Sequence, residues 1–433
     1  MKTFKIKNKG QPISRRTFNT IFSLGLANIA LPQAKANRGP KIVIIGGGIG
    51  GVNVARILAL KMTTWKITLI EPNKVHITPF GTNHYLTGTQ NLHNFSYHYN
   101  TISQISNIEV IHDWVTSIDP EKRKVKLKKS KNLTFDKLII ATGIGLIFDS
   151  IEGYDFECSQ LFPHAYEGTN DSQWKLLFQQ IRAMPNGGLM TISVPKRPYR
   201  CTPAPYERAS LIAEYLKREK PKSKILLLDS KNEFPLMDMI LEIWNKDYGN
   251  LIEWVSADFG GEIIAIDKKN KTLISTDEKF TADVINIIPP QFAGNIASES
   301  GLTDNTGWCP INGSTFESTL IPNIHLIGDI INAGDMPKSA SSAISQAQHL
   351  AAAILAEFAR KSHIRGQLKN SCFFFTGSQS AVIIGGEYYF DGNHIVGQRG
   401  YSSDIDENKH DRQQNAIQAH NWYKDITQKT FLK

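Results

Sequence analysis

The chain repeats one pattern of hydrophobic and polar positions, in which a short apolar run is followed by a helical repeat and a second apolar run. The first copy has apolar runs at 41–45 and 66–70, separated by a glycine-rich turn and a helical pattern through Val54, Ile57 and Leu58. Compact β-branched runs of this kind form buried parallel strands. The pattern therefore predicts a βαβ unit at the start of the folded chain.

A second copy of the pattern begins near residue 188. Apolar runs at 189–194 and 224–229 flank a helical segment predicted from about 206 to 217. Between 282 and 348 the pattern returns to features of the first copy. We therefore predict an α/β fold with two doubly wound, Rossmann-like domains, the first of which is discontinuous.

The domain boundaries follow from these patterns. The first domain is expected at 37–150 and 285–357, with the second domain inserted between them at 151–284. The last segment, 358–433, is richer in aromatic and polar side chains, and we expect it to form a separate C-terminal cap or interface region.

Positive charge is concentrated in the first 36 residues. The chain has 49 Lys and Arg against 40 Asp and Glu, but seven of the basic residues and no acid lie in that segment. Without it, 42 basic residues remain against 40 acidic ones. The net charge therefore gives no support for a nucleic-acid partner.

The same segment has the form of an export signal. Its basic start is followed by Ser14-Arg15-Arg16-Thr17-Phe18, an apolar run at 21–31 and Ala34-Lys35-Ala36, which resembles a twin-arginine signal with a small-residue cleavage site. An uncleaved anchor is the alternative, although the run is shorter than the ~20 residues that span a bilayer. We expect no transmembrane segment later in the chain, and we predict that residues 1–36 direct the protein to the periplasm.

The cysteines argue against a metal cluster. Cys158, Cys201, Cys309 and Cys372 are widely spaced and form no Cys-x-x-Cys pair, so no metal site and no covalent haem are predicted. In an oxidising compartment, a disulfide can form among them.

The turn after the first apolar run carries a G-x-G-x-x-G motif. Gly46 permits the tight turn, Gly48 lets the backbone approach a pyrophosphate, and Gly51 lets the helix pack closely on the strand. Glu71 follows 20 residues after Gly51, where it can accept hydrogen bonds from an adenosine ribose. The motif predicts a dinucleotide at the N-terminus of the helix, and a tight turn without a ligand is the alternative.

Two later apolar runs decide for FAD over a nicotinamide cofactor at this site. One ends in Ala141-Thr142-Gly143 and the other in Gly328-Asp329, and both resemble secondary motifs of two-dinucleotide-domain flavoproteins, in which the aspartate binds the ribityl chain. Taken alone, Asp329 could instead cap the end of its strand. The predicted FAD-binding residues are Gly46, Gly48, Gly51, Glu71, Val115, Thr142, Gly143, Gly328, Asp329 and Lys338.

Lys338 precedes a helical pattern expected at 343–352. The N-terminus of this helix would direct positive potential at the flavin ring and stabilise the anion that forms on two-electron reduction. We expect Lys338 to add to this potential, with an exposed loop position as the alternative.

The second domain lacks a glycine fingerprint of its own. The corresponding loop at 195–207 has no glycine, and its prolines remove amide donors where phosphates would need them. We therefore expect no binding of NAD(P)H there.

At this loop the chain resembles a known family. The stretch Tyr199-Arg200-Cys201-Thr202-Pro203-Ala204-Pro205-Tyr206-Glu207-Arg208-Ala209-Ser210 is similar to the active-site loop of the flavoprotein subunit of flavocytochrome c sulfide dehydrogenase. Further similar stretches occur in the family's order, at 151–154, 307–310, 336–339, 370–372 and around 421–423. Sulfide:quinone oxidoreductases are more distant relatives with the same architecture.

The resemblance implies a reaction through two cysteines. In the family, a disulfide beside the flavin is formed by cysteines that match Cys201 and Cys372. Hydrosulfide attacks one sulfur, a persulfide forms, and the released thiolate donates to the flavin. Glu207 matches the family's active-site glutamate and would relay protons. From the spacing alone, a structural disulfide or two buried thiols, and a solvated glutamate, remain open; Cys158 and Cys309 are expected to be structural.

One departure from the family concerns the flavin linkage. Some members tether FAD covalently through a cysteine, and the matching position here is Pro79. We therefore expect the FAD to be bound without a covalent link.

These observations give one main functional hypothesis and two alternatives. The main hypothesis is a periplasmic enzyme that oxidises sulfide, or a related thiol or persulfide, to sulfur or polysulfide and passes electrons to a separate c-type cytochrome. The first alternative is a sulfide:quinone oxidoreductase, which would need an apolar membrane-docking surface. The second is a catalytically silent flavin-binding or assembly protein.

Overall fold

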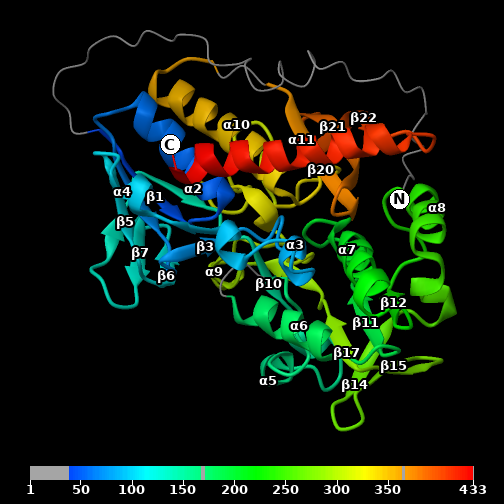
Figure 1. The fold of residues 1–433 in the computed structure, drawn as a ribbon. Helices are drawn as coiled ribbons and strands as arrows, with labels where there is room; N and C mark the ends of the chain where they lie inside the picture. The colour runs from blue at the N-terminus through cyan, green and yellow to red at the C-terminus, as the bar shows by residue number, and fades with distance from the viewer. Residues whose placement is uncertain (1–38, 167–170, 363–365, 433) are drawn as a thin grey trace.

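The computed structural model describes residues 39–166, 171–362 and 366–432. The predicted export signal at 1–36 lies outside the described residues. The main sheets of the fold are two parallel sheets and a C-terminal antiparallel sheet, and smaller antiparallel sheets accompany them (Figure 1).

The first sheet confirms that the first Rossmann-like domain is discontinuous. Its five parallel strands are, in spatial order, β19 (Ile324–Leu326), β9 (Lys137–Ile140), β1 (Lys41–Ile45), β2 (Lys66–Ile70) and β5 (Ile108–Ile111). The last strand in the sequence, β19, therefore pairs with β9 across the inserted domain. Helices α2 (Ile49–Lys61) and α10 (Ala340–Phe358) pack against each other over this sheet (Figure 1).

A small antiparallel sheet adds to the first domain. It consists of β6 (Val115–Asp119), β7 (Lys124–Leu127) and β8 (Leu133–Thr134). Along β7 exposed lysines alternate with Val125 and Leu127, which belong to the core of the first domain. The period of two is that of a strand with one buried face.

The second sheet has four parallel strands, in the order β13 (Ile252–Val255), β12 (Lys224–Asp229), β11 (Leu189–Val194) and β17 (Val284–Ile287). Its helices are α6 (Ser172–Ala183), α7 (Ala204–Glu219) and α8 (Met237–Tyr248), and β14 (Ile263–Asp267), β15 (Thr272–Ser275) and β16 (Lys279–Thr281) form a meander beside it. The expected boundary between 284 and 285 falls inside β17, so the second unit extends further than predicted. An apolar run shows that a strand is present, but not which sheet it joins.

Short elements connect the two units. The chain leaves the first unit through β10 (Ile144–Leu146) and returns through β18 (Gln291–Ala293), and these two strands pair antiparallel.

The remaining short elements lie between the longer strands and helices. They are β3 (Val75–Ile77), α3 (Asn83–Leu86), η1 (Leu92–Phe95), β4 (Ser96–His98), α4 (Asn100–Ser103), η2 (Phe148–Ser150), α5 (Phe156–Ser159), η3 (Gly249–Leu251), η4 (Ala257–Phe259), α9 (Asn295–Glu299) and η5 (Gly328–Ile330).

The C-terminal region packs on both units. The strands β20 (Leu368–Gly377), β21 (Ser380–Phe390) and β22 (Ile395–Ser402) form an antiparallel sheet, and the long helix α11 (Lys409–Thr427) crosses the molecule to η6 (Gln428–Leu432) (Figure 1). Phe431 is buried in the core of the first unit, whereas Phe374 is buried in the core of the second. The region therefore joins the two units.

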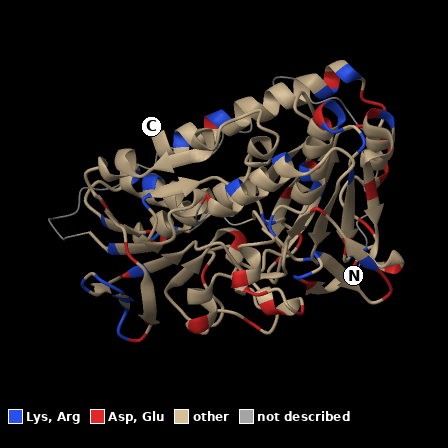
Figure 2. Ribbon diagram, turned by 60° about the horizontal axis from the view of Figure 1, so that its bottom comes forward, with Lys and Arg blue, Asp and Glu red and all other residues tan. Residues whose placement is uncertain are grey.

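Charged residues of both signs are interspersed over most elements of the described chain (Figure 2). Within that part of the chain, no helix is both long enough and apolar enough to cross a membrane.

Candidate active site

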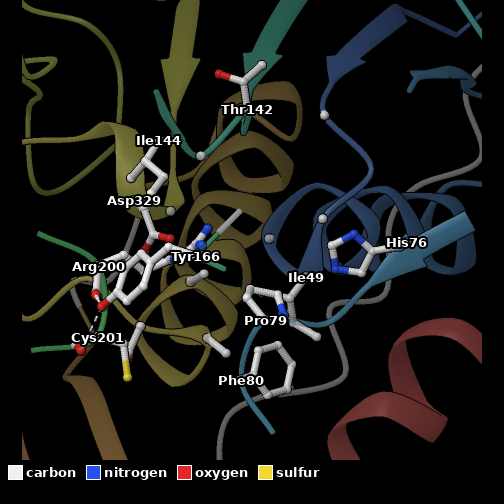
Figure 3. Close-up of a pocket in the computed structure, with 18 of the residues that line it drawn as sticks. Ile49, His76, Pro79, Phe80, Thr142, Ile144, Tyr166, Arg200, Cys201 and Asp329 are labelled. Atoms are coloured by element: carbon white, nitrogen blue, oxygen red, sulfur yellow. Dashed lines mark hydrogen bonds between the residues drawn. The ribbon is translucent and has the colours of Figure 1, made fainter. Parts of the chain in front are cut away.

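A cavity of about 960 Å³ lies where the two units and the C-terminal region meet. This volume is at the upper end of the ~300–1,000 Å³ range of small-molecule sites. Most of the predicted site residues line it: Gly46, Gly48, Glu71, Val115, Thr142, Gly143, Cys201, Glu207, Gly328, Asp329 and Cys372. In Figure 3, Cys201, Arg200, Tyr166 and Asp329 lie together on one side of the cavity, opposite Ile49, His76 and Pro79.

The turn between β1 and α2 can be built only with glycine at two positions. Gly46 has a φ of +104°, and a Cβ there would lie 2.5 Å from the Ala141 carbonyl oxygen. A Cβ on Gly51 would lie 1.9 Å from the carbonyl oxygen of Gly46, so Gly51 acts through the turn although it does not line the cavity. Gly48 caps α2 without a side-chain hydrogen bond, which leaves amide groups of the first helical turn available to phosphate oxygens.

Glu71, at the end of β2, ties this turn in place. Its carboxylate accepts hydrogen bonds from the backbone N–H of Gly47 at 2.9 Å and from the backbone and side-chain nitrogens of Asn73 at 2.9 Å each. A carboxylate has about four acceptor positions. Glu71 therefore keeps capacity for one ribose hydroxyl.

The residues of the cavity fit FAD. The buried hydroxyl oxygen of Thr142 has no hydrogen-bond partner among the described residues, and buried hydroxyls are normally paired. A dinucleotide bound along the carboxyl ends of β1, β2, β9 and β19 would lie against the glycine turn and would supply a hydrogen-bond partner for Thr142. Among the described residues, no group of three or more His, Cys, Asp or Glu is arranged to hold a metal ion.

Lys338 is placed differently from the prediction. It does not line the cavity; its ammonium donates to the backbone carbonyls of Asp329 at 2.8 Å and Ile331 at 2.6 Å and lies 3.5 Å from the centre of the Trp308 ring. Burial lowers the pKa of Lys338 to about 7. Lys338 therefore fixes the turn that carries Asp329. Its ammonium group pairs with backbone carbonyls of that turn, which need hydrogen-bond donors.

The start of α10 brings Cys201 and Cys372 to one place. The backbone N–H of Cys201 donates to the carbonyl oxygen of Lys338 at 2.8 Å. Ser339 caps α10 and donates to the side-chain oxygen of Asn370 at 2.5 Å, and the thiol of Cys372 donates to the same oxygen at 3.5 Å. Both cysteines are separate thiols in this structure.

Both thiols have raised pKa values. Burial raises the pKa of Cys201 well above its usual range, and nearby Cys372 and Glu207 raise it further. Burial also raises the pKa of Cys372, against hydrogen-bonding interactions with Asn370 and Ser339 that lower it. An isolated thiolate is therefore disfavoured here, so a covalent or charge-transfer partner would have to stabilise it.

Glu207 lies in the first turn of α7 and lines the same part of the cavity. Its carboxylate accepts from Asn83 Nδ2 at 2.8 Å and from the backbone N–H of Phe375 at 3.1 Å. Burial raises the pKa of Glu207 to about 7, although both hydrogen bonds lower it. The group can therefore take up and release a proton near neutral pH.

Sequence reasoning missed several polar residues of the cavity. Arg200 lines it, and one of its buried guanidinium nitrogens has no hydrogen-bond partner among the described residues. Tyr166 donates from its hydroxyl to the carbonyl oxygens of Arg200 and Cys201, which holds Cys201 at a φ of +52°. The adjacency of Arg200 to Cys201 was a usable signal, whereas nothing local marks Tyr166 or Asn83.

The other two cysteines lie outside the cavity lining. Burial raises the pKa of Cys309 to about 12 and also raises the pKa of Cys158. The backbone of Cys309 pairs with that of Ile331 in an isolated β-bridge. Cys158 belongs to a separate apolar cluster.

The crevice of the second unit is filled by its own side chains. Asp229, at the end of β12, is fully buried and accepts from Tyr206 at 2.5 Å, from Trp254 at 3.0 Å and from Lys231. The ring of Tyr206 stacks on Phe234 at a centroid distance of 4.0 Å. The acid in the position that binds a ribose in NAD domains is therefore already occupied.

Comparison with known proteins gives three family models in chain order. The pyridine nucleotide-disulphide oxidoreductase model matches 40–171, the central model of the flavocytochrome c sulfide dehydrogenase flavoprotein chain matches 174–289, and the flavin-binding model of flavocytochrome c sulphide dehydrogenase matches 365–431. The last two together contain Cys201, Glu207 and Cys372.

Similar proteins carry related names. The mitochondrial sulfide:quinone oxidoreductase of Mus musculus is 25% identical over 330 residues, which cover 71% of this chain and 68% of the relative. The sulfide-quinone reductase of Aquifex aeolicus is 30% identical over 186 residues, or 42% of this chain and 41% of the relative.

The fold is also that of a solved oxidoreductase structure. The sulfide:quinone oxidoreductase from Aquifex aeolicus superimposes with a TM-score of 0.71 at 19% identity and covers 90% of this chain and 91% of that chain. The chain is therefore an FAD-binding oxidoreductase with two Rossmann-like domains, whose central and C-terminal segments match the family models of the flavocytochrome c sulfide dehydrogenase flavoprotein chain and whose sequence is similar to sulfide:quinone oxidoreductases.

Proposed function

We propose that this flavin-dependent oxidoreductase oxidises sulfide, or a related small sulfur species, to sulfur or polysulfide through Cys201 and Cys372. The observation that carries the proposal is that the two residues before α10 tie both cysteines to the cavity wall, Lys338 through Cys201 and Ser339 through Asn370, and that Glu207 lines the same cavity and acts on both thiols. Two thiols and a carboxyl group with a pKa of about 7 are the groups that thiol exchange with proton transfer needs.

In the oxidised protein, Cys201 and Cys372 form a disulfide. Hydrosulfide attacks one sulfur, the bond between the two cysteines breaks, and a persulfide forms on the attacked cysteine while the other leaves as a thiolate. A second hydrosulfide attacks the outer sulfur, which releases a hydrodisulfide and a second thiolate. The two cysteines then hold the two electrons that sulfide has lost.

Glu207 exchanges protons in this sequence. As the carboxylate, it accepts the proton of the persulfide or of incoming hydrogen sulfide, and it returns the proton when a thiolate must be neutralised. Its hydrogen bonds from Asn83 and Phe375 fix the carboxylate at the wall of the cavity.

FAD, when bound, supplies the two-electron acceptor that lets the disulfide form again. The glycine turn at 46–51 and the N-terminus of α2 would hold its pyrophosphate, Glu71 its adenosine ribose, and Thr142 and Asp329 its polar chain. The N-terminus of α10, whose residues Ser339 to Ser341 line the cavity, provides positive potential toward the reacting groups.

We further propose that the electrons pass to a separate c-type cytochrome and that the protein works in the periplasm. The family models at 174–289 and 365–431 and the twin-arginine-like segment at 1–36 support this. A quinone acceptor is the second candidate, because the similar curated proteins are named sulfide:quinone oxidoreductases. Co-purification with a haem chain supports the first acceptor, and reduction of a soluble quinone analogue by sulfide supports the second.

An anaerobic titration of the purified holoprotein with sulfide tests the proposal. We expect the oxidised flavin absorbance to bleach stoichiometrically. Flavin that stays oxidised in excess sulfide would mean that the protein binds FAD without this activity.

A further inference from the structure

Asn83 joins two buried charged groups of α7. It is 5% exposed and lies at the start of α3, in the first unit. Its side-chain nitrogen donates to Glu207 Oε1 at 2.8 Å, and its side-chain oxygen accepts from Arg208 Nε at 3.1 Å. One amide thus links the acid of the site to a cation that is not used in the proposed reaction.

The chemistry of Arg208 determines which way this amide points. A guanidinium group can only donate hydrogen bonds, so the atom of Asn83 that faces Arg208 must be the carbonyl oxygen. The amide nitrogen is then turned toward Glu207, where it can only donate. The orientation of Asn83 therefore follows from its neighbours.

Arg208 cannot easily move away from Asn83. It is 1% exposed, and its other nitrogens donate to the carbonyl oxygens of His164 at 3.1 Å and Ala165 at 2.6 Å and to the side-chain oxygen of Asn286 at 2.7 Å. Burial lowers the pKa of Arg208 to about 10, so it remains a cation at neutral pH. Its hydrogen-bond partners are all neutral oxygens.

We propose that Arg208 and Asn83 are positioning residues that keep a fixed hydrogen-bond donor on Glu207 and thereby set the pH at which Glu207 exchanges its proton. The backbone N–H of Phe375, from β20, is the second donor at 3.1 Å. Donors to a carboxylate stabilise its charged form and oppose the effect of burial. The use of this proton in sulfide oxidation rests on the proposed function. The effect of the two residues on the pH at which Glu207 titrates does not depend on it.

The other ionisable groups that face Glu207 are few. Cys201 and Cys372 line the cavity beside it, and the charge of Glu207 acts on both thiols. His84 from α3 and His420 from α11 line the same cavity. Burial lowers the pKa of His84 to about 4 and also lowers the pKa of His420. Two arginines line this cavity: Arg200 acts on Cys201, whereas Arg208 is the cation whose charge acts on Glu207.

Infrared titration of the carboxyl band of Glu207 in the FAD-loaded protein tests the inference, with the band assigned by its loss in Glu207→Gln. In Asn83→Asp, the new carboxylate would keep its contact with Arg208 and present a negative oxygen to Glu207. We expect the titration midpoint to rise by roughly 1–3 pH units. In Asn83→Leu, which removes the donor without adding charge, we expect a smaller rise.

A matched control lies elsewhere in the chain. Asn415 is also buried, and its side-chain nitrogen donates to Glu407 at 3.0 Å, outside the cavity lining. Asn415→Asp should leave the Glu207 midpoint unchanged. An unchanged midpoint in the folded Asn83 variants, or an equal rise in Asn415→Asp, would overturn the inference. Failure of sulfide to bleach the wild-type flavin would overturn the proposed function alone, because the infrared band reports on Glu207 without turnover.

Discussion

Gly51 is the position at which the dinucleotide turn has least room. A Cβ there would lie 1.9 Å from the carbonyl oxygen of Gly46, so Gly51→Ala must push the helix and the turn apart. Such overpacking costs about 1–3 kcal/mol, which corresponds to a roughly 5- to 150-fold weaker affinity for FAD if the strain falls on the holo form. Fluorescence titration of the apoprotein with FAD measures this.

Gly400→Ala is the matched control for that prediction. The nearest atom to a Cβ at Gly400 is 4.0 Å away, so this change should leave FAD affinity unaltered. Equal affinities for FAD in the two variants would show that the turn does not hold the cofactor.

Pro79 lies at the position where some family members carry the cysteine that tethers FAD, and it lines the cavity. A proline side chain has no nucleophilic atom with which to form such a bond. We expect acid precipitation to release all flavin into the supernatant. Flavin that remains with the precipitated chain would contradict this.

Glu207 gives a prediction for the pH dependence. Burial raises its pKa to about 7, and the carboxylate form that accepts protons prevails above that pH. The rate of flavin reduction by sulfide should therefore rise through about pH 7. The Glu207→Gln variant should be roughly 10²-fold slower and should not show this rise with pH. Stopped-flow absorbance across the pH range measures both.

The raised pKa of Glu207 also makes folding stability depend on pH, and stability falls as the pH rises. Between the ordinary carboxyl range and about pH 7, the folded protein holds a proton that the unfolded chain releases, so rising pH destabilises the fold. Glu207→Gln removes this dependence, and its unfolding free energy should fall less than that of the wild type over the same interval. A steeper fall in the variant would mean that the pKa of Glu207 is not raised.

At this scale, residues with a strict local requirement could be predicted from the sequence. Gly46 and Gly51 have no sterically allowed substitute, and the sequence therefore marks them. Lys338 was misplaced because its partners are backbone carbonyls, which no sequence pattern reveals. Asn83 was missed because its two partners lie more than 120 residues away in the chain.

Among the elements, the loop between β11 and α7 decides against a nicotinamide cofactor. It has no glycine, and the acid that follows, Asp229, is buried under hydrogen bonds from Tyr206 and Trp254. We expect no useful rate of flavin reduction by NADH or NADPH under anaerobic conditions. Rapid bleaching by either would mean that the aromatic cluster opens to admit the cofactor.

The two Rossmann-like units were predictable because strand and helix periods are local properties of a sequence. The predicted boundary at 284/285 was wrong because the apolar sequence of β17 (Val284–Ile287) fits a buried strand of either sheet. Its pairing with β11 is a contact between distant parts of the chain, which a local pattern does not show.

At the scale of the whole molecule, the C-terminal region completes the site. Its strand β20 carries Cys372 against the start of α10, while the second unit delivers Cys201 to the same turn. The sequence predicted an interface region at 358–433, but it could not show that Phe431 and Phe374 enter two different cores. Packing of this kind depends on the assembled surfaces of both units.

The most direct test of the cysteine mechanism is stopped-flow reduction of the bound flavin by sulfide in Cys201→Ser and Cys372→Ser. Serine cannot take part in thiol exchange, so each variant should keep its FAD and lose roughly 10³-fold or more in rate. Cys158→Ala and Cys309→Ala, whose thiols lie outside the cavity lining, should react like the wild type if they fold. Reduction of Cys201→Ser by sulfide at the wild-type rate would contradict the account, and sulfide would then have to react without the cysteine pair.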